Sequence, residues 1–102
     1  MVEPSYPLVE LLSKPDCHLC ETAKAVLQSL QARYRFTLRE IDITHETALL
    51  AQFAEQIPVG FINGRKVFKY RVDQRQFERH LQRASSAPNG SLWQRLKALR
   101  ST

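Results

Sequence analysis

The chain has 102 residues, of which 43% are hydrophobic, and its formal net charge is +5. This length predicts a single domain with a modest core, and no apolar run reaches the roughly 20 residues that a membrane-spanning helix needs. The N-terminal residues lack the basic and long apolar regions of a secretory signal. We therefore expect a cytoplasmic protein that does not act at a membrane.

The positive charge is concentrated in the second half of the chain. The segment up to Gly60 contains five Lys and Arg and eight Asp and Glu, a net charge of −3. The segment from Phe61 onward contains ten Lys and Arg and two Asp and Glu, a net charge of +8. Such a basic half can attract an anionic ligand, an acidic protein surface or a phosphate backbone. The aromatic residues do not alternate with Lys and Arg as base-stacking platforms do. We therefore expect a solvated basic face and no nucleic-acid partner.

The first predicted strand leads directly into the first predicted helix. Residues 8–12 form an apolar segment, and Pro15 ends it because proline has no N–H for a strand ladder. From Cys17 onward the apolar residues recur at the three- and four-residue spacing of a helix face. These residues are Leu19, Ala23, Val26, Leu27 and Leu30. The helix is therefore expected to begin at or near Cys17.

A second strand and a second helix follow. Apolar and polar residues alternate over residues 34–41, which predicts a half-buried strand. Thr44 is a suitable N-cap for the next helix. The apolar face of that helix is expected to consist of Leu49, Leu50, Phe53 and Ala54.

The next segment predicts a β-hairpin followed by a third helix. Asn63-Gly64 between two apolar runs, residues 59–62 and 66–70, is a strong signal for a tight hairpin turn. Pro58 stands at the head of the first of these strands. Asp73, with Gln76 three residues later, resembles the capping box that begins a helix. The inward face of that helix is expected to consist of Phe77, Leu81 and Ala84.

The C-terminal residues differ in composition from the rest. Residues 85–91 have the composition of a linker, and residues 92–102 place Leu and Trp side chains at helical spacing among basic residues. We therefore divide the chain into a domain over residues 1–84 and a segment over residues 85–102, a linker and a short amphipathic helix. That helix either docks on the domain or forms an exposed tail, and we favour docking because burial of Trp and Leu is favourable. The element order is β-α-β-α-β-β-α plus this tail helix, an α/β fold with a four-stranded mixed sheet between helices.

Cys17 and Cys20 are the only cysteines of the chain. A bridge across so short a loop removes little chain entropy, so reversible thiol–disulfide chemistry explains the pair better than structural support does. A helix N-terminus offers unpaired N–H groups and a partial positive charge, which favour a thiolate at Cys17. Lys14 and His18 add positive charge nearby, and His18 between the cysteines is expected to make the disulfide more oxidising.

Two motifs together resemble small glutaredoxin-like proteins of the thioredoxin fold. One is Ser-Lys-Pro-Asp-Cys-His-Leu-Cys over residues 13–20, and the other is Ile-Pro-Val-Gly-Phe-Ile-Asn-Gly over residues 57–64. The resemblance spans residues 8–84. It implies that Cys17 is the nucleophile and Cys20 the resolving thiol of a thiol–disulfide oxidoreductase.

The resemblance also implies roles for three neighbouring residues. Pro58 would be a cis-proline beside the cysteines, and the backbone of Ile57 would pair with a bound peptide or glutathione. Lys14 would favour the thiolate and meet a glutathione carboxylate. Substrates would be protein disulfides or glutathione mixed disulfides, handled by a monomer with no resident cofactor and with glutathione as a conceivable co-substrate.

The stretch after the hairpin departs from this family pattern. Glutaredoxins carry a Gly-Gly pair and an Asp there, and these groups hold glutathione. Residues 68–73 here read Phe-Lys-Tyr-Arg-Val-Asp and contain no glycine. The sequence therefore leaves open whether glutathione binds.

Three other interpretations of the cysteine pair compete with thiol–disulfide exchange. Structural zinc needs about four ligands, and only His18, His45 and His80 remain, in three unrelated segments. A c-type haem attachment requires a histidine directly after the second cysteine, where this chain has Glu21. A redox-inactive protein-binding module on the same fold stays as the alternative, because a fold does not dictate a function.

Overall fold

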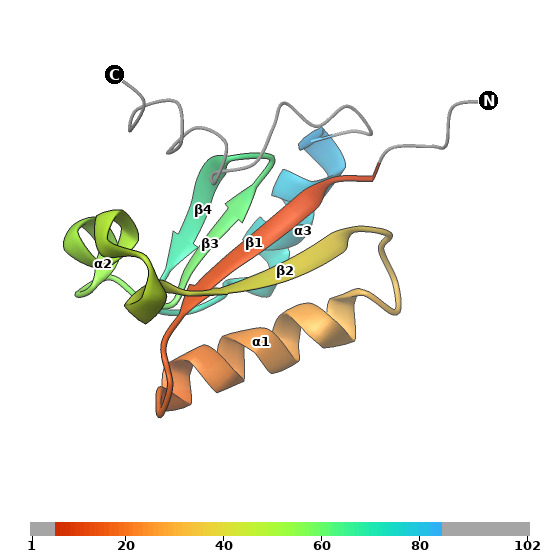
Figure 1. The fold of residues 1–102 in the computed structure, drawn as a ribbon. Helices are drawn as coiled ribbons and strands as arrows, with labels where there is room; N and C mark the ends of the chain where they lie inside the picture. Colours follow the sequence, from red (N-terminus) through yellow and green to blue (C-terminus); the bar gives the residue numbers. More distant parts are fainter. Residues whose placement is uncertain (1–5, 85–102) are drawn as a thin grey trace, which may run out of the picture.

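The computed structural model describes residues 6–84, which form a four-stranded sheet with helices on both faces (Figure 1). The elements are β1 (Leu8–Ser13), α1 (His18–Leu30), β2 (Thr37–Asp42), the 3-10 helix η1 (Ile43–His45), α2 (Thr47–Phe53), β3 (Val59–Ile62), β4 (Arg65–Lys69) and α3 (Gln74–Ala84). This order confirms the predicted fold class. The predicted tail over residues 85–102 lies outside the described residues. Within the described part of the chain, no helix is long and apolar enough to cross a membrane.

The strands are arranged in the order β2-β1-β3-β4. β1 runs parallel to β2 and antiparallel to β3, and β3 and β4 form an antiparallel hairpin. The parallel pair requires a crossover, which α1 supplies. β1 is therefore a central strand, and its C-terminal end leads into α1.

Two apolar clusters lie on opposite faces of the sheet. Successive side chains of a strand point to opposite faces, so Val9 and Leu11 of β1 pack toward α1 and α3 while Leu12 packs toward α2. The first cluster is completed by Ala23, Leu27, Leu30, Phe36, Ile62, Phe77 and Leu81. The second is completed by Cys20, Ile43, Leu49, Phe53, Ile57, Val59 and Phe61.

Two local expectations about the second helix were wrong. Thr44 is not its N-cap, because η1 intervenes and the Asp42 carboxylate accepts the hydrogen bond from the Thr44 N–H (2.9 Å). α2 begins at Thr47, and the side chain of its N-cap, Glu46, makes no capping hydrogen bond. Leu50 and Ala54 do not share the buried face. Leu50 is 39% exposed whereas Leu49 is fully buried, and Ala54 is exposed and is the C-cap of α2.

The β3–β4 turn agrees with its sequence signal. Asn63 and Gly64 both have positive φ, at 51° and 82°, as a type I′ turn requires. The backbone N–H of Asn63 donates to the Leu8 carbonyl (2.8 Å), and the Asn63 side-chain oxygen accepts from the Leu8 N–H (2.9 Å). The turn is therefore tied to the start of β1.

Gly60, in the middle of β3, makes room for an aromatic ring. A Cβ at this position would overlap the Phe68 ring of β4. The Phe68 ring thereby lies against the β3 backbone and also packs edge-on against Phe77 of α3, with centroids 6.0 Å apart. The absence of a side chain at residue 60 thus permits the packing between the hairpin and α3.

Candidate active site

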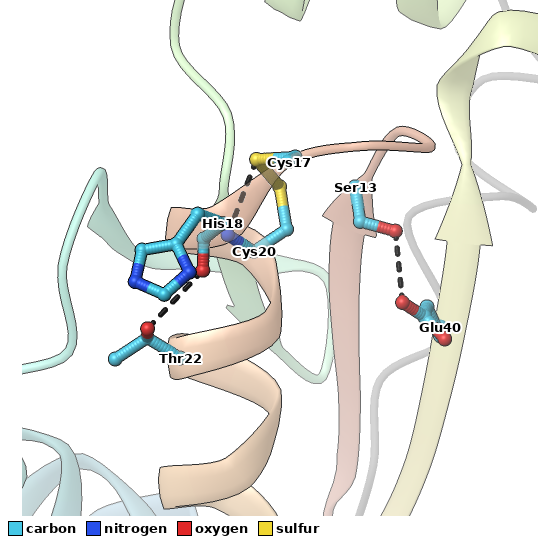
Figure 2. The surroundings of a disulfide bond; sticks show 6 residues. All are labelled: Ser13, Cys17, His18, Cys20, Thr22 and Glu40. Atoms are coloured by element: carbon cyan, nitrogen blue, oxygen red, sulfur yellow. Dashed lines mark hydrogen bonds between the residues drawn. A yellow bond between two sulfur atoms is a disulfide. The ribbon is translucent and has the colours of Figure 1, made fainter.

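Cys17 and Cys20 form a disulfide where β1 leads into α1 (Figure 2). Cys17 is the N-cap of α1, and its Sγ accepts a hydrogen bond from the backbone N–H of Cys20 (3.1 Å). Asp16, with φ of 57°, turns the chain just before the cap. An N–H of the first helical turn is therefore directed at the Cys17 sulfur, where the partial positive charge of the helix end favours a thiolate.

The two cysteines differ in exposure. Cys20 is 2% exposed and belongs to the apolar cluster on the α2 side of the sheet, whereas Cys17 is partly exposed and packs at the edge of that cluster. An incoming group can therefore reach the sulfur of Cys17 more readily than that of Cys20. This asymmetry suits an attacking and a resolving thiol.

Ile57 and Pro58 lie in the segment between α2 and β3. The peptide bond that joins them is cis. Ile57 is 8% exposed and packs in the same cluster as Cys20, with Cys17 at its edge. The adjacent Pro58 is fully buried. The fold thus brings this segment, 40 positions away in sequence, beside the disulfide.

Lys14 and His18 are both exposed on the loop and first turn that carry Cys17. The imidazole of His18 is directed away from the two sulfur atoms, and its backbone carbonyl accepts a hydrogen bond from the Thr22 hydroxyl (3.1 Å; Figure 2). Lys14 lines a hollow of about 340 Å³ into which Cys20 also faces. Both side chains therefore belong to the surroundings of the disulfide and make no hydrogen bond to it.

A polar network that the sequence did not predict borders the same hollow. The hydroxyl of Ser13, which is 4% exposed, donates to Glu40 Oε2 (3.0 Å; Figure 2). Lys24 Nζ lies 3.0 Å from Glu40 Oε1. These contacts join the ends of β1 and β2 to α1. They fix the scaffold from which the Cys17 loop departs.

Asp42, at the end of β2, also lines this hollow. The pKa of its carboxyl is lowered, chiefly because the Thr44 hydroxyl donates to it (2.6 Å) and next because the Thr44 backbone N–H does so. Hydrogen bonds of this kind favour the charged form of a carboxyl group. The carboxylate therefore stays ionised to lower pH than in an open chain.

Between residues 6 and 84, no group of three or more His, Cys, Asp and Glu side chains is placed to hold a metal ion. The arrangement at the start of α1 is instead suited to electron transfer through sulfur–sulfur bonds.

Tyr70 is a neighbour of the site that the sequence did not reveal. It follows β4, has φ of 69°, and donates its backbone N–H to the Pro58 carbonyl (2.7 Å). An aromatic residue carries no sequence signal for a left-handed conformation, which is usually occupied by Gly or Asn.

Comparisons with known proteins agree with this geometry. Residues 8–82 match the glutaredoxin-like domain family (DUF836). The glutaredoxin-like protein YDR286C homolog of Dictyostelium discoideum is 32% identical over 72 residues, which are 65% of this chain and 67% of that protein.

Solved structures show the same fold. Protein Ne2328 from Nitrosomonas europaea superimposes with a TM-score of 0.68 at 29% identity, covering 79% of this chain and 95% of that one. A mutant thioredoxin from Halobacterium salinarum gives a TM-score of 0.59 at 16% identity, covering 81% and 78%, a likeness of fold alone. The chain therefore belongs to the glutaredoxin-like domain family and has the thioredoxin fold.

Proposed function

We propose that this protein is a thiol–disulfide oxidoreductase that alternates between a Cys17/Cys20 dithiol and the disulfide. The observation that carries the proposal is the position of Cys17, which is partly exposed at a helix N-terminus and joined to a buried Cys20. The family to which the chain belongs supports a redox-type function. The described structure corresponds to the oxidised form.

The reaction begins with the Cys17 thiolate. It attacks one sulfur of a target disulfide, the target S–S bond breaks, and the departing half leaves as a thiolate that takes a proton from water. A mixed disulfide between Cys17 and the other half remains. Cys20 then gives up its proton to solvent, attacks the Cys17 sulfur and releases the second half as a thiol. Two electrons have passed to the target, and the Cys17–Cys20 disulfide has formed.

Residues around the cysteines support these steps. The N–H of Cys20 and the helix end stabilise negative charge on Cys17. Lys14 and His18 add positive charge, and we assign the backbone of Ile57 to hold the substrate chain by strand-like hydrogen bonds. External thiols, with glutathione as one candidate, would restore the dithiol. We place this cycle in the cytoplasm, where such reductants keep thiols reduced.

The test is to offer the pre-reduced protein a glutathionylated peptide and an ordinary protein disulfide and to measure the reduction of each. We expect reduction of at least one, with loss of the protein's two free thiols in the same proportion. The control is a variant with both Cys17→Ser and Cys20→Ser, which cannot exchange. A wild-type protein that reduces neither substrate would contradict the proposal and favour the redox-inactive binding module.

A further inference from the structure

The backbone N–H and the side-chain hydroxyl of Tyr70 both donate hydrogen bonds to the segment that leads into β3. Its backbone N–H donates to the carbonyl oxygen of Pro58 (2.7 Å), and its hydroxyl donates to the carbonyl oxygen of Glu55 (3.1 Å). The side chain therefore extends along the segment from Glu55 to Pro58. The backbone bond holds the residue at this segment, and the hydroxyl bond orients its ring.

That segment borders the disulfide. Ile57, within it, packs in the apolar cluster that contains Cys20, and Cys17 packs at the edge of the same cluster. The pairing of β4 with β3, and of β3 with β1, puts the end of β4 at the end of β1 from which α1 starts (Figure 1). Tyr70 therefore lies at the end of the sheet that carries the disulfide.

The backbone of Tyr70 is in a conformation that aromatic residues disfavour. Among the described residues other than glycine, only Asp16, Asn63 and Tyr70 have positive φ. Asp and Asn tolerate this region, whereas a bulky side chain does so only when its surroundings enforce it. Glycine would make the same turn without strain. A strained residue kept at such a place points to a role for its side chain.

The ring of Tyr70 also remains open to solvent. The residue is 44% exposed, and the Lys69 ammonium lies 5.4 Å from the ring centroid. Leu19, between the two cysteines, is 41% exposed. A fixed and exposed aromatic ring can bury apolar area against a ligand with little further loss of conformational freedom.

We propose that Tyr70 is a specificity-determining residue for the disulfide site, an inference that rests on the proposed function. Its ring supplies apolar area on the β4 side of the disulfide, and the exposed Leu19 supplies it on the α1 side. A polypeptide disulfide substrate lies against the Tyr70 ring with a large apolar side chain next to the reacting cysteine. Glutathione has no large apolar side chain, so it buries little apolar area against the ring. The site therefore favours polypeptide disulfides over glutathione disulfide.

The experiment compares two symmetric disulfides in single turnovers of the pre-reduced full-length protein. One is the disulfide-linked dimer of a short peptide with leucine next to its cysteine, and the other is oxidised glutathione. Each turnover oxidises the Cys17/Cys20 dithiol and releases two substrate thiols, so no other reductant is needed. Tyr70→Gly should lower the rate constant for the peptide about tenfold and leave that for oxidised glutathione within about twofold.

Two variants separate the ring from the backbone and the hydroxyl. Tyr70→Phe keeps the ring and the backbone hydrogen bond to Pro58 but loses the hydroxyl bond that orients the ring, so the ratio of the two rate constants should fall by no more than about twofold. Asn63→Gly makes the same kind of backbone change at the opposite end of the hairpin, and it should also leave the ratio unchanged. Thermal unfolding of each variant verifies that the fold is kept.

The outcomes distinguish this inference from the proposed function. A tenfold fall in the ratio for Tyr70→Gly alone supports the role of the ring. An unchanged ratio, or a Tyr70→Phe variant that behaves like Tyr70→Gly, overturns the inference while turnover by the wild type still upholds the proposed function. A wild-type protein that reduces neither disulfide overturns the proposed function and the inference with it.

Discussion

The two ends of the sheet use left-handed backbone conformations in different ways. At the β3–β4 turn the residues with positive φ are Asn63 and Gly64, and at the disulfide end they are Asp16 and Tyr70. Asn and Gly adopt this conformation at low cost, and two hydrogen bonds tie Asn63 to Leu8. The disulfide end instead keeps an aromatic residue in a disfavoured conformation.

This difference separates stability from function within one small fold. The turn end is closed by Asn63 and Gly64, residue types that adopt positive φ at low cost. The disulfide end combines a strained Tyr70 with two exposed apolar side chains, Leu19 and Tyr70 itself. Strain and exposed apolar surface persist at functional sites because substrate binding uses them. Substitutions at the two ends should therefore affect different measurements.

The largest expected effect comes from the cysteines at the disulfide end. Cys17→Ser removes the attacking sulfur and should abolish disulfide reduction, because a serine hydroxyl does not take part in sulfur exchange. Cys20→Ser keeps the attack but removes the resolving step, so a mixed disulfide with the target should accumulate and be visible by mass spectrometry. Equal residual activity in the two variants would argue against separate roles.

The next effect concerns the reactivity of the two sulfurs in the reduced protein. Cys17 lies at the positive end of α1 and is partly exposed, whereas Cys20 is buried. The alkylation rate of Cys17 should therefore level off below about pH 8 and exceed that of Cys20 by about tenfold. Peptide mapping after timed iodoacetamide labelling measures both rates. A Cys17 rate that still climbs past about pH 9 would show that the helix end does not stabilise its thiolate.

A stability comparison tests the two ends directly. Asn63→Ala loses the hydrogen bond from Leu8, worth about 1 kcal/mol, and puts a less tolerant residue at positive φ, at about 1 kcal/mol more. Tyr70→Phe loses one exposed hydroxyl hydrogen bond, worth about 1 kcal/mol or less. Chemical denaturation should show Asn63→Ala destabilised by about 2 kcal/mol and Tyr70→Phe by about 1 kcal/mol or less. Equal destabilisation would make Tyr70 a structural residue.

The smallest effect is a pH dependence at Asp42. The hydroxyl and N–H of Thr44 lower its pKa in the folded state, so the unfolded chain binds a proton more readily. This contribution to stability is present above the usual pKa of the group and is lost as pH falls through the lowered value. Asp42→Asn keeps a capping oxygen but cannot titrate. The gap between the melting temperatures of wild type and variant should therefore narrow from about pH 6 to about pH 3.

The fold was predictable from the sequence where a local signal decided the structure. The Asn63-Gly64 turn and the Asp73 cap are examples, since the Asp73 carboxylate accepts the hydrogen bond from the Gln76 N–H (3.1 Å) as expected. The spacing of apolar residues located α1, whose N-cap is Cys17. Leu19 was wrongly expected on its inward face, since it is 41% exposed. The cysteine pair itself predicted the position of the candidate site.

Other features depend on contacts that a sequence does not display. Asp42 and Thr44 are both good caps, and only the geometry after β2 decided that Asp42 accepts from Thr44. Glu10 has no exposed surface although charged residues are seldom fully buried; it lies opposite Arg39 of β2, with 3.7 Å between the charged groups. The position of Tyr70 along the segment from Glu55 to Pro58 arises from tertiary packing, which brings Tyr70 to Glu55, 15 positions earlier in the chain.

The packing of Phe68 against Gly60 predicts that these two positions change together in evolution. The ring of Phe68 occupies the space that a Cβ on residue 60 would need, so the two positions cannot change independently. Relatives that gain a side chain at position 60 should have exchanged the aromatic at position 68 for a small residue, and those that keep the aromatic should keep the glycine. Covariation between these two columns of an alignment would record that constraint.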